Sequence, residues 1–324
     1  MIVISRCPYR ISLLGGGSDL GWFVDKNGFG LSFGFSIKSY TRIALCKRSE
    51  IYKKGILNYS SREEYENIES ISHPLIRAAL INLNIKDPLE ISSFGDALIG
   101  GGLGSSSSFT IALLKALKFL NGLEVSNFEI AKLASYIEIN NLSKNIGIQD
   151  QFLCALGGGN ALLYKPNNDV QIIEKYSLKD IAKKFSENLF IINTGISRSS
   201  TKSLNLLKSE VESFKNIKKI LKIAEIFIKK IDFLSKDDQI KLLEESIIES
   251  WEIKKSLKGV FNEDLIKLEN FINNSGFKVL KLLGAGYGGY FLVKYHGDDF
   301  EKDKEVLNKF NLRIDKVNLS DKGC

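Results

Sequence analysis

Cysteine and histidine are scarce in this sequence of 324 residues, which contains four cysteines and two histidines. The cysteines are scattered along the chain and no two of them form a C-x-x-C pair, which argues against a disulfide scaffold or a zinc site. Such cysteine usage is typical of the reducing cytoplasm, and we expect a cytoplasmic protein. With so few imidazoles, any chemistry is expected to depend on carboxylates, hydroxyls and the cations of arginine and lysine.

Long apolar runs are also missing. No segment has 18 or more uninterrupted apolar residues, so we expect no membrane span. The start of the chain lacks the basic, apolar and small-residue regions of a signal peptide. The net charge of +7 does not indicate nucleic acid, because the lysines lie in helical stretches alongside glutamates. A modest positive field instead suits a small anionic substrate.

Strand and helix patterns are mixed along the first half of the chain. Residues 9–14 alternate between polar and apolar as a strand does, and residues 106–121 are apolar on nearly every side, which predicts a buried helix. Near residue 186 the character changes, and helical patterns dominate the stretch that follows. We therefore predict two domains, residues 1–186 and residues 187–324.

A glycine- and serine-rich run, GGGLGSSSSFTIALL, opens the predicted buried helix at residues 100–114. It is not a Walker A loop, because no Gly-Lys-Ser/Thr occurs in the chain. Glycines nevertheless expose backbone N–H groups, and the positive end of a helix dipole favours an anion. The run therefore predicts a phosphate site rather than a flexible linker. Its residues are Gly100, Gly101, Gly102, Leu103, Gly104, Ser105, Ser106 and Ser107.

Two carboxylates stand out after this helix. If the helix that starts at Ser126 continues, Glu138 shares its face with Ala134 and Leu142, and a charge on an apolar stripe needs compensation. A bound Mg²⁺ would compensate it, and an internal salt bridge is the alternative. Asp150 lies near the expected start of a short helix, where the ionised form is favoured; it is either a proton acceptor or a plain capping acid.

The N-terminal stretch PYRISLLGGGSDL places three glycines directly after a strand. Glycine allows a sharp turn and the close approach of a ligand. Arg10 lies on the strand before the turn and Asp19 follows it. On its own this stretch is equally well read as a tight turn with surface charges.

Gly284, Gly286 and Gly289 in LKLLGAGYGGYFLV satisfy the pattern G-x-G-x-x-G after a strand. A dinucleotide site requires a helix after these glycines, but YFLVKY has the pattern of a strand. The arrangement strand, glycine loop, strand therefore excludes the dehydrogenase interpretation.

Taken together, in this order and spacing, the stretches resemble the motifs of the GHMP sugar and metabolite kinases over nearly the whole chain. GGGLGSSSS is similar to the family motif that wraps the phosphates of ATP, and PYRISLLGGGSDL to its N-terminal substrate motif. LLGAGYGG resembles the C-terminal glycine motif, and GIQDQF the segment with the catalytic aspartate. The resemblance implies an α+β, two-domain GHMP kinase fold, with mixed sheets, helices packed on them and the active site between the domains.

The resemblance also implies roles for individual residues. Asp150 would be the catalytic carboxylate, with Arg10 beside it and beside the transferred phosphoryl group. ATP would bind to the glycine and serine loop, and Mg²⁺ to Ser106 and Glu138. The sugar would contact Asp19 and the two glycine motifs. The substrate residues implied in those motifs are Gly16, Gly17, Ser18, Gly286 and Tyr287, although Tyr287 interrupts what is usually an unbroken glycine run.

Within the family, RISLLGGGSDL looks most like the branch that phosphorylates D-glycero-D-manno-heptose 7-phosphate at its anomeric carbon, for nucleotide-heptose and surface polysaccharide synthesis. Our hypothesis is then that Arg198 or Lys202, in NTGISRSSTKS, binds the phosphate of the sugar; a helix cap with solvated charges is the alternative. A fucose or galactose kinase, another GHMP branch and a catalytically inactive binding module stay open as alternatives. The expected partner is a small sugar phosphate, with no nucleic acid and no membrane, and a homodimer is left open.

Overall fold

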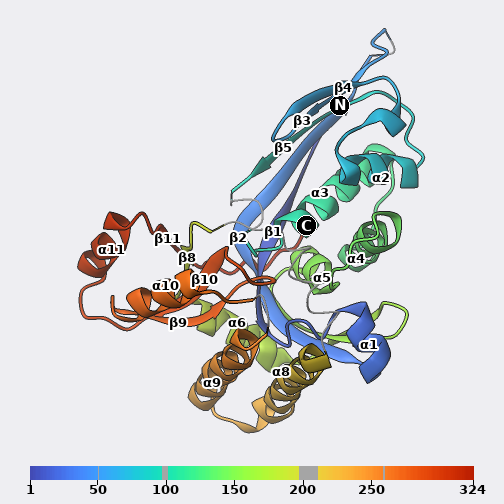
Figure 1. Cartoon of the computed structure of the whole chain (residues 1–324). Coiled ribbons are helices and arrows are strands. Elements are labelled where there is room, and N and C mark those ends of the chain that lie inside the picture. The colour runs from blue at the N-terminus through green and yellow to red at the C-terminus, as the bar shows by residue number, and fades with distance from the viewer. Residues whose placement is uncertain (50, 97–100, 197–210, 258–259) are drawn as a thin grey trace.

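The computed structural model describes residues 1–49, 51–96, 101–196, 211–257 and 260–324. Two sheets carry the fold, with helices packed on them (Figure 1). The strands of the larger sheet are β1 (Ile2–Leu14), β2 (Gly30–Lys47), β3 (Gly55–Asn58), β4 (Arg62–Tyr65), β5 (Leu89–Gly95), β6 (Gly159–Lys165) and β7 (Asp169–Ile173). The strands of the smaller sheet are β8 (Leu189–Asn193), β9 (Phe277–Leu282), β10 (Tyr290–Tyr295) and β11 (Ile314–Lys316).

The larger sheet has the order β4-β3-β5-β2-β6-β7, and β1 pairs with β2 outside this path. Its strands are antiparallel except for the parallel pair β3 and β5, so the sheet is mixed. The long strand β2 pairs with β6 near its start and with β5 near its end, while β1 runs beside it along most of its length. The pair β1 and β2 therefore forms the central part of the larger sheet (Figure 1).

The smaller sheet has the order β11-β8-β10-β9 and is antiparallel throughout. The prediction that the last glycine motif joins two strands is confirmed, since β9 and β10 flank it and pair with each other. The α+β class with mixed sheets is likewise confirmed.

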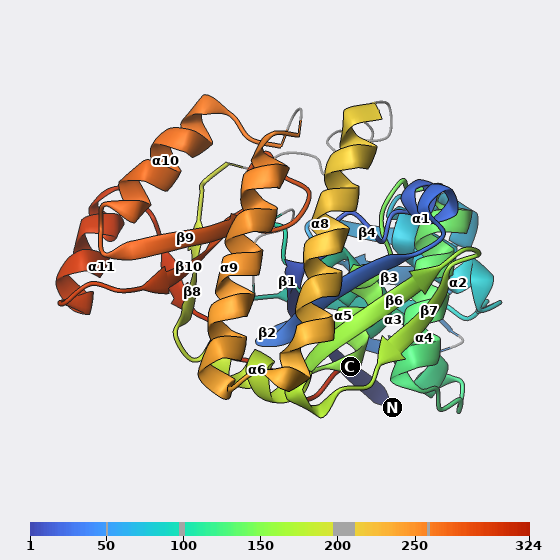
Figure 2. The same ribbon diagram turned by 90° about the horizontal axis from the view of Figure 1, so that it is seen from below.

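Helices pack on both sheets (Figures 1 and 2). Helices α3 and α5 pack on β1 and β2, α8 and α9 lie side by side, and α9 and α10 pack on β9. The helices are α1 (Gly21–Asn27), α2 (Pro74–Asn82), α3 (Ser105–Leu120), α4 (Asn127–Tyr136), α5 (Gln149–Leu156), α6 (Tyr176–Ser186), α8 (Val211–Lys230), α9 (Lys236–Lys255), α10 (Glu263–Asn273) and α11 (Phe300–Lys309). Single turns of 3₁₀-helix lie at η1 (Ile68–Ser70) and η3 (Ile231–Phe233), and a π-helical turn at η2 (Ile137–Asn141).

Local sequence signals explain where several helices begin and end. Pro74 is the first residue of α2, and Ser126 forms a capping box with Glu129 at the start of α4. One expectation was wrong: α4 ends at Tyr136, and the chain continues through η2. Because a π turn has a different residue spacing from an α-helix, the predicted shared face of Glu138 and Leu142 is lost. Leu142 is partly exposed, while Glu138 is buried.

The hydrophobic core that matters most for the site joins the two sheets. It contains Phe33 of β2, Leu280 of β9 and Phe227 of α8, and the rings of Phe33 and Phe227 stack with centroids 5.7 Å apart. The predicted domain boundary near residue 186 falls between α6 and β8 and stays a prediction. None of the helices in the described ranges has both the length and the apolar character needed to cross a bilayer.

Candidate active site

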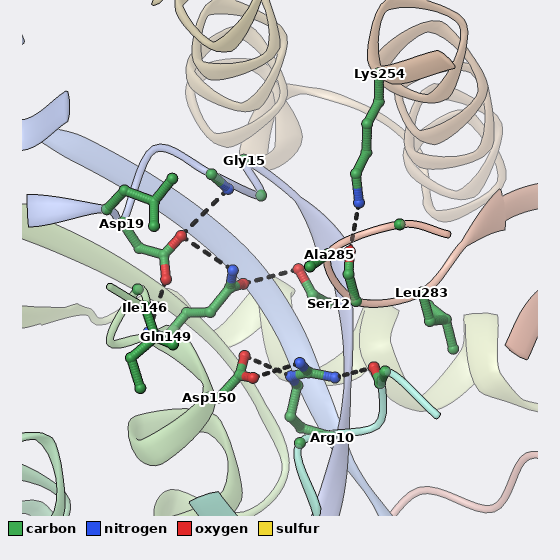
Figure 3. A pocket seen from close by; sticks show the side chains of 18 of the residues that line it. Arg10, Ser12, Gly15, Asp19, Ile146, Gln149, Asp150, Lys254, Leu283 and Ala285 are labelled. Atoms are coloured by element: carbon green, nitrogen blue, oxygen red, sulfur yellow. Dashed lines mark hydrogen bonds and ion pairs between the residues drawn. The ribbon is translucent and has the colours of Figure 1, made fainter. Parts of the chain in front are cut away.

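A cavity of about 330 Å³ lies where the two sheets meet, with walls from both of them. Its size is that of a small-molecule site. One wall comes from the end of β1, the loop that follows it, the first turn of α3 and the start of α5. The opposite wall comes from α8, α9, β9 and the glycine loop after β9. Figure 3 shows the polar side chains that meet in this cavity.

The centre of the cavity is an ion pair between Arg10 and Asp150 (Figure 3). Arg10 Nε and Nη2 donate to the two carboxylate oxygens of Asp150 at 2.7 and 2.5 Å, and Nη1 donates to the carbonyl oxygen of Gly102 at 2.5 Å. The Arg10 side chain is buried, whereas that of Asp150 is 28% exposed toward the cavity. One guanidinium thus joins β1, the glycine loop and the first turn of α5 through its rigid fork.

The glycine loop presents the N-terminus of α3 to this cavity. Gly104 is the N-cap residue, has φ +75° and supplies no side-chain cap, so the first N–H groups of α3 stay available for an anion. Gly102 has φ +80°, and a Cβ there would lie 2.5 Å from the carbonyl oxygen of Leu283. The loop after β9 therefore packs directly on the phosphate loop, and only glycine fits at this contact.

Asp19 lies on another side of the cavity, where three N–H donors fix its carboxylate. The backbone N–H of Gln149 donates to Oδ2 at 3.0 Å, and Gln149 Nε2 and the Gly17 N–H donate to Oδ1 at 3.1 and 3.2 Å. Asp19 is 3% exposed, and burial raises its pKa to about 6 in spite of these hydrogen bonds. Gln149 also accepts a hydrogen bond from Ser12 Oγ at 2.8 Å, which locks the amide in place.

Glu138 is 1% exposed and belongs to a small polar cluster behind the first turn of α3. Its Oε2 accepts hydrogen bonds from Lys144 Nζ at 2.8 Å and from Ser106 Oγ at 3.5 Å, and its Oε1 accepts from Gln151 Nε2 at 3.1 Å. Lys144 Nζ also lies 3.4 Å from Ser106 Oγ. The salt bridge that the sequence left open as an alternative is thus present, and the lysine cation contacts both oxygens predicted to bind metal.

These oxygens also fit a magnesium ion. A cation already lies against the Glu138 carboxylate and the Ser106 hydroxyl, which shows that the pair accommodates positive charge. Mg²⁺ is commonly held by one or two protein oxygens, with phosphate and water oxygens completing the octahedron. Among the described residues no group of three or more His, Cys, Asp or Glu side chains could hold a metal. A site on Glu138 and Ser106 therefore depends on ligands from a bound nucleotide.

The remaining predicted residues divide into three groups. Gly16, Gly17, Ser105, Ser107 and Gly286 line the cavity. Gly101, Leu103, Ser18 and Tyr287 do not: the Ser18 hydroxyl donates to the carbonyl oxygens of Gly15 and Leu31, and the Tyr287 N–H donates to the carbonyl oxygen of Val260. A substrate contact through Tyr287 stays a prediction. Gly100, Arg198 and Lys202 lie outside the described residues.

Sequence reasoning missed several polar residues that line the same cavity. Gln149 is next to Asp150 in the motif GIQDQF, and this position could have drawn attention to it. Lys144, Lys254 and Lys281 carried no such signal, because each looks like an ordinary lysine of a helical, loop or strand segment.

Comparisons with known proteins agree with this architecture. Residues 73–158 match the family described as GHMP kinases N terminal domain. The D-glycero-alpha-D-manno-heptose 7-phosphate kinase of Campylobacter jejuni is 28% identical over 302 residues, which are 88% of this chain and 87% of that protein. A crystal structure of a D-glycero-D-manno-heptose 1-phosphate kinase from Bacteroides thetaiotaomicron has a TM-score of 0.76 and 19% identity, covering 100% of this chain and 97% of that one. A mevalonate kinase structure has a TM-score of 0.71 and 22% identity, covering 98% and 99%.

The two solved structures share the fold with this chain at low identity, and the matching family model lies on the segment that holds α3, α4 and α5. Residues 73–158 thus match the N-terminal domain of the GHMP kinases, as the motifs indicated. The α+β fold of the chain is the fold of these solved kinase structures.

Proposed function

We propose that this protein is an ATP-dependent sugar kinase that phosphorylates a sugar phosphate at its anomeric hydroxyl. The preferred substrate is D-glycero-D-manno-heptose 7-phosphate, and the product is the 1,7-bisphosphate. The observation that carries the proposal is the placement of Asp19 and of the Arg10–Asp150 pair around one cavity with the glycine loop. The similarity to a heptose 7-phosphate kinase supports the choice of sugar.

In the proposed reaction the anomeric hydroxyl attacks the γ-phosphorus of ATP and ADP leaves. The N–H groups at the start of α3 hold phosphate oxygens, and Arg10 stabilises charge on the transferred group. Magnesium held by Glu138 and Ser106 would neutralise phosphate charge. Asp150 accepts the hydrogen bond of the attacking hydroxyl. Its two oxygens already bond to Arg10, which fixes the orientation of the carboxylate, so we assign its main contribution to orienting the hydroxyl.

The substrate assignment is tested by measuring ATP consumption with heptose 7-phosphate, free heptose, galactose, fucose and mannose. We expect the highest kcat/KM with heptose 7-phosphate. A higher value with galactose or fucose would identify another sugar 1-kinase. The absence of turnover and of thermal stabilisation by ATP would instead identify a binding module.

Activity is expected to fall as the pH drops below about 6, because Asp19 then becomes protonated. Burial raises the pKa of Asp19, so its charge is present above about pH 6 and is lost below it. A neutral carboxyl is a poorer acceptor for sugar hydroxyls, and kcat/KM reports the ionisation of the free enzyme. Because the phosphate monoester of the sugar also titrates near pH 6, kcat/KM for the sugar should fall more steeply below about pH 6 in the wild type than in Asp19→Asn. An equally steep fall in the variant would exclude a contribution from Asp19.

Glu138→Gln is expected to raise the Mg²⁺ concentration needed for half-maximal activity by at least about tenfold, because the neutral amide is a weaker ligand for a hard cation. The same change removes the carboxylate partner of Lys144. Titration of activity with MgCl₂ at saturating ATP measures the effect, and the exposed Glu124, changed to Gln, is the matched control. Identical magnesium curves for wild type and Glu138→Gln would rule out this site.

A further inference from the structure

The wall of the cavity formed by α9 and β9 carries three polar side chains that the mechanism does not use. Ser250 and Lys254 are four residues apart, so they lie on the same face of α9. Lys281 belongs to β9 and is 7% exposed. All three line the cavity that contains Arg10, Asp19 and Asp150.

The polar groups of this wall are incompletely satisfied. The hydroxyl of Ser250 is buried and has no hydrogen-bond partner among the described residues. Lys254 Nζ donates to the carbonyl oxygen of Gly284 at 2.5 Å, and Lys281 Nζ to that of Leu13 at 2.9 Å. Within the described ranges neither ammonium has an ion pair with a carboxylate. Burying a cation without a counter-ion is unfavourable, so this wall is expected to receive an anion.

Electrostatics agrees with this expectation. Burial lowers the pKa of Lys254 to about 8 and lowers that of Lys281 as well, and the charge of Arg10 adds to both shifts. A bound dianion would reverse these shifts, because it favours the charged form of each lysine. The carboxylates Asp19 and Asp150 offset part of the lowering of the Lys254 pKa, but neither of them forms an ion pair with Lys254.

The location favours the acceptor sugar over the nucleotide as the source of the anion. The carbonyl oxygen that accepts from Lys281 belongs to Leu13, two residues before the glycine turn whose Gly17 N–H donates to Asp19. In Figure 3, Lys254 reaches from α9 toward the loop with Ala285, and Asp19 lies at the other side of the view. The nucleotide has its own donors at the start of α3, where Lys144 also lies.

We propose that Ser250, Lys254 and Lys281 form the subsite for the phosphate monoester of the acceptor sugar. This inference rests on the proposed function, and it assigns to this wall the phosphate that the sequence hypothesis gave to Arg198 or Lys202, which lie outside the described residues. A sugar that meets Asp19 with its hydroxyls and Asp150 with its anomeric oxygen would present its distal phosphate to α9 and β9. There the two ammonium groups and the free hydroxyl supply charge-assisted hydrogen bonds to the phosphate oxygens.

The test measures dissociation constants by titration calorimetry for heptose 7-phosphate, free heptose and ATP with Mg²⁺. Methionine has nearly the length of lysine without its charge, so Lys254→Met and Lys281→Met are the informative variants. Each is expected to weaken the binding of heptose 7-phosphate by at least about tenfold, with little change for free heptose or ATP. Lys254→Arg should retain a preference for the phosphorylated sugar, since it keeps the charge.

The controls separate this inference from its assumptions. Lys278→Met changes an exposed lysine on the same strand as Lys281 and should leave all three constants unchanged. If Lys281→Met does not fold, Lys254→Met and Ser250→Ala still decide the matter. The proposed subsite would be wrong if the folded variants kept the wild-type preference for the phosphorylated sugar. It would also be wrong if only the affinity for ATP fell. If the wild-type protein binds heptose 7-phosphate but phosphorylates no sugar, the proposed function is wrong. The binding measurements on the variants would then still test the subsite.

Discussion

Replacing Asp150 with asparagine is expected to lower kcat by about 10²–10⁴-fold while ATP still binds. An amide can accept a hydrogen bond from the attacking hydroxyl through one oxygen, but it carries no charge and therefore orients the hydroxyl less firmly. It also breaks the two-point contact with Arg10. Steady-state kinetics gives kcat, and titration calorimetry gives the dissociation constant of ATP.

The same substitution has an expected cost in stability, which must be separated from its effect on catalysis. Arg10 is buried, and its ion pair with Asp150 is partly screened because Asp150 is 28% exposed. We expect the free energy of unfolding to fall by about 1–3 kcal/mol, below the range for breaking a fully buried pair. Denaturant unfolding measures this loss, and the exposed Asp25, changed to Asn, is the matched control. Near-normal kcat in folded Asp150→Asn would remove Asp150 from the mechanism.

The motifs predicted the local structure of the site well, because each motif depends on short-range chemistry. The glycines before α3 were expected to open a helix for an anion, and Gly104 is indeed its N-cap. The strand after the last glycine motif was predicted from the strand pattern of YFLVKY, which argued against a dinucleotide site. The capping box at Ser126 likewise fixed the start of α4 without reference to the rest of the chain.

Contacts between distant segments were beyond reach of the pattern alone. Arg10 and Asp150 are 140 residues apart, and only the family resemblance suggested that they lie together. The packing of Leu283 on Gly102 depends on how the two sheets approach each other, which no local pattern encodes. The prediction that α4 continues through Glu138 was wrong, because hydropathy does not distinguish a π-helical turn from an α-helical one.

The burial of two lysines could not be predicted from the sequence either. Lys254 lies in an amphipathic helix and Lys281 in a strand, and sequence patterns place such residues in solvent. The structure instead has both facing the cavity because α9 packs on β9 and on β1. Their position follows from the tertiary arrangement, so the charge they bring to the site could not be predicted from the motifs.

Arg10→Lys is expected to lower kcat by about 10³-fold or more although it preserves the charge. The guanidinium donates to two oxygens of Asp150 and to the carbonyl oxygen of Gly102 at once. An ammonium at the end of a shorter side chain is a single point charge and cannot hold both partners in this planar geometry. The position of the catalytic carboxylate relative to the glycine loop is therefore lost, and the stabilisation of charge on the transferred phosphoryl group is weakened.

The matched control is Arg6→Lys, on the same strand, where the guanidinium is exposed and lies 5.0 Å from the ring of Tyr40. This control should retain wild-type kcat, because Arg6 does not line the cavity. A double variant, Arg10→Lys with Asp150→Asn, adds a sharper criterion. If the two residues act as one unit, the combined loss in kcat should be far smaller than the product of the two single losses. Fully multiplicative losses would mean that Arg10 and Asp150 act independently, and the ion pair would then have no part in positioning the attacking hydroxyl.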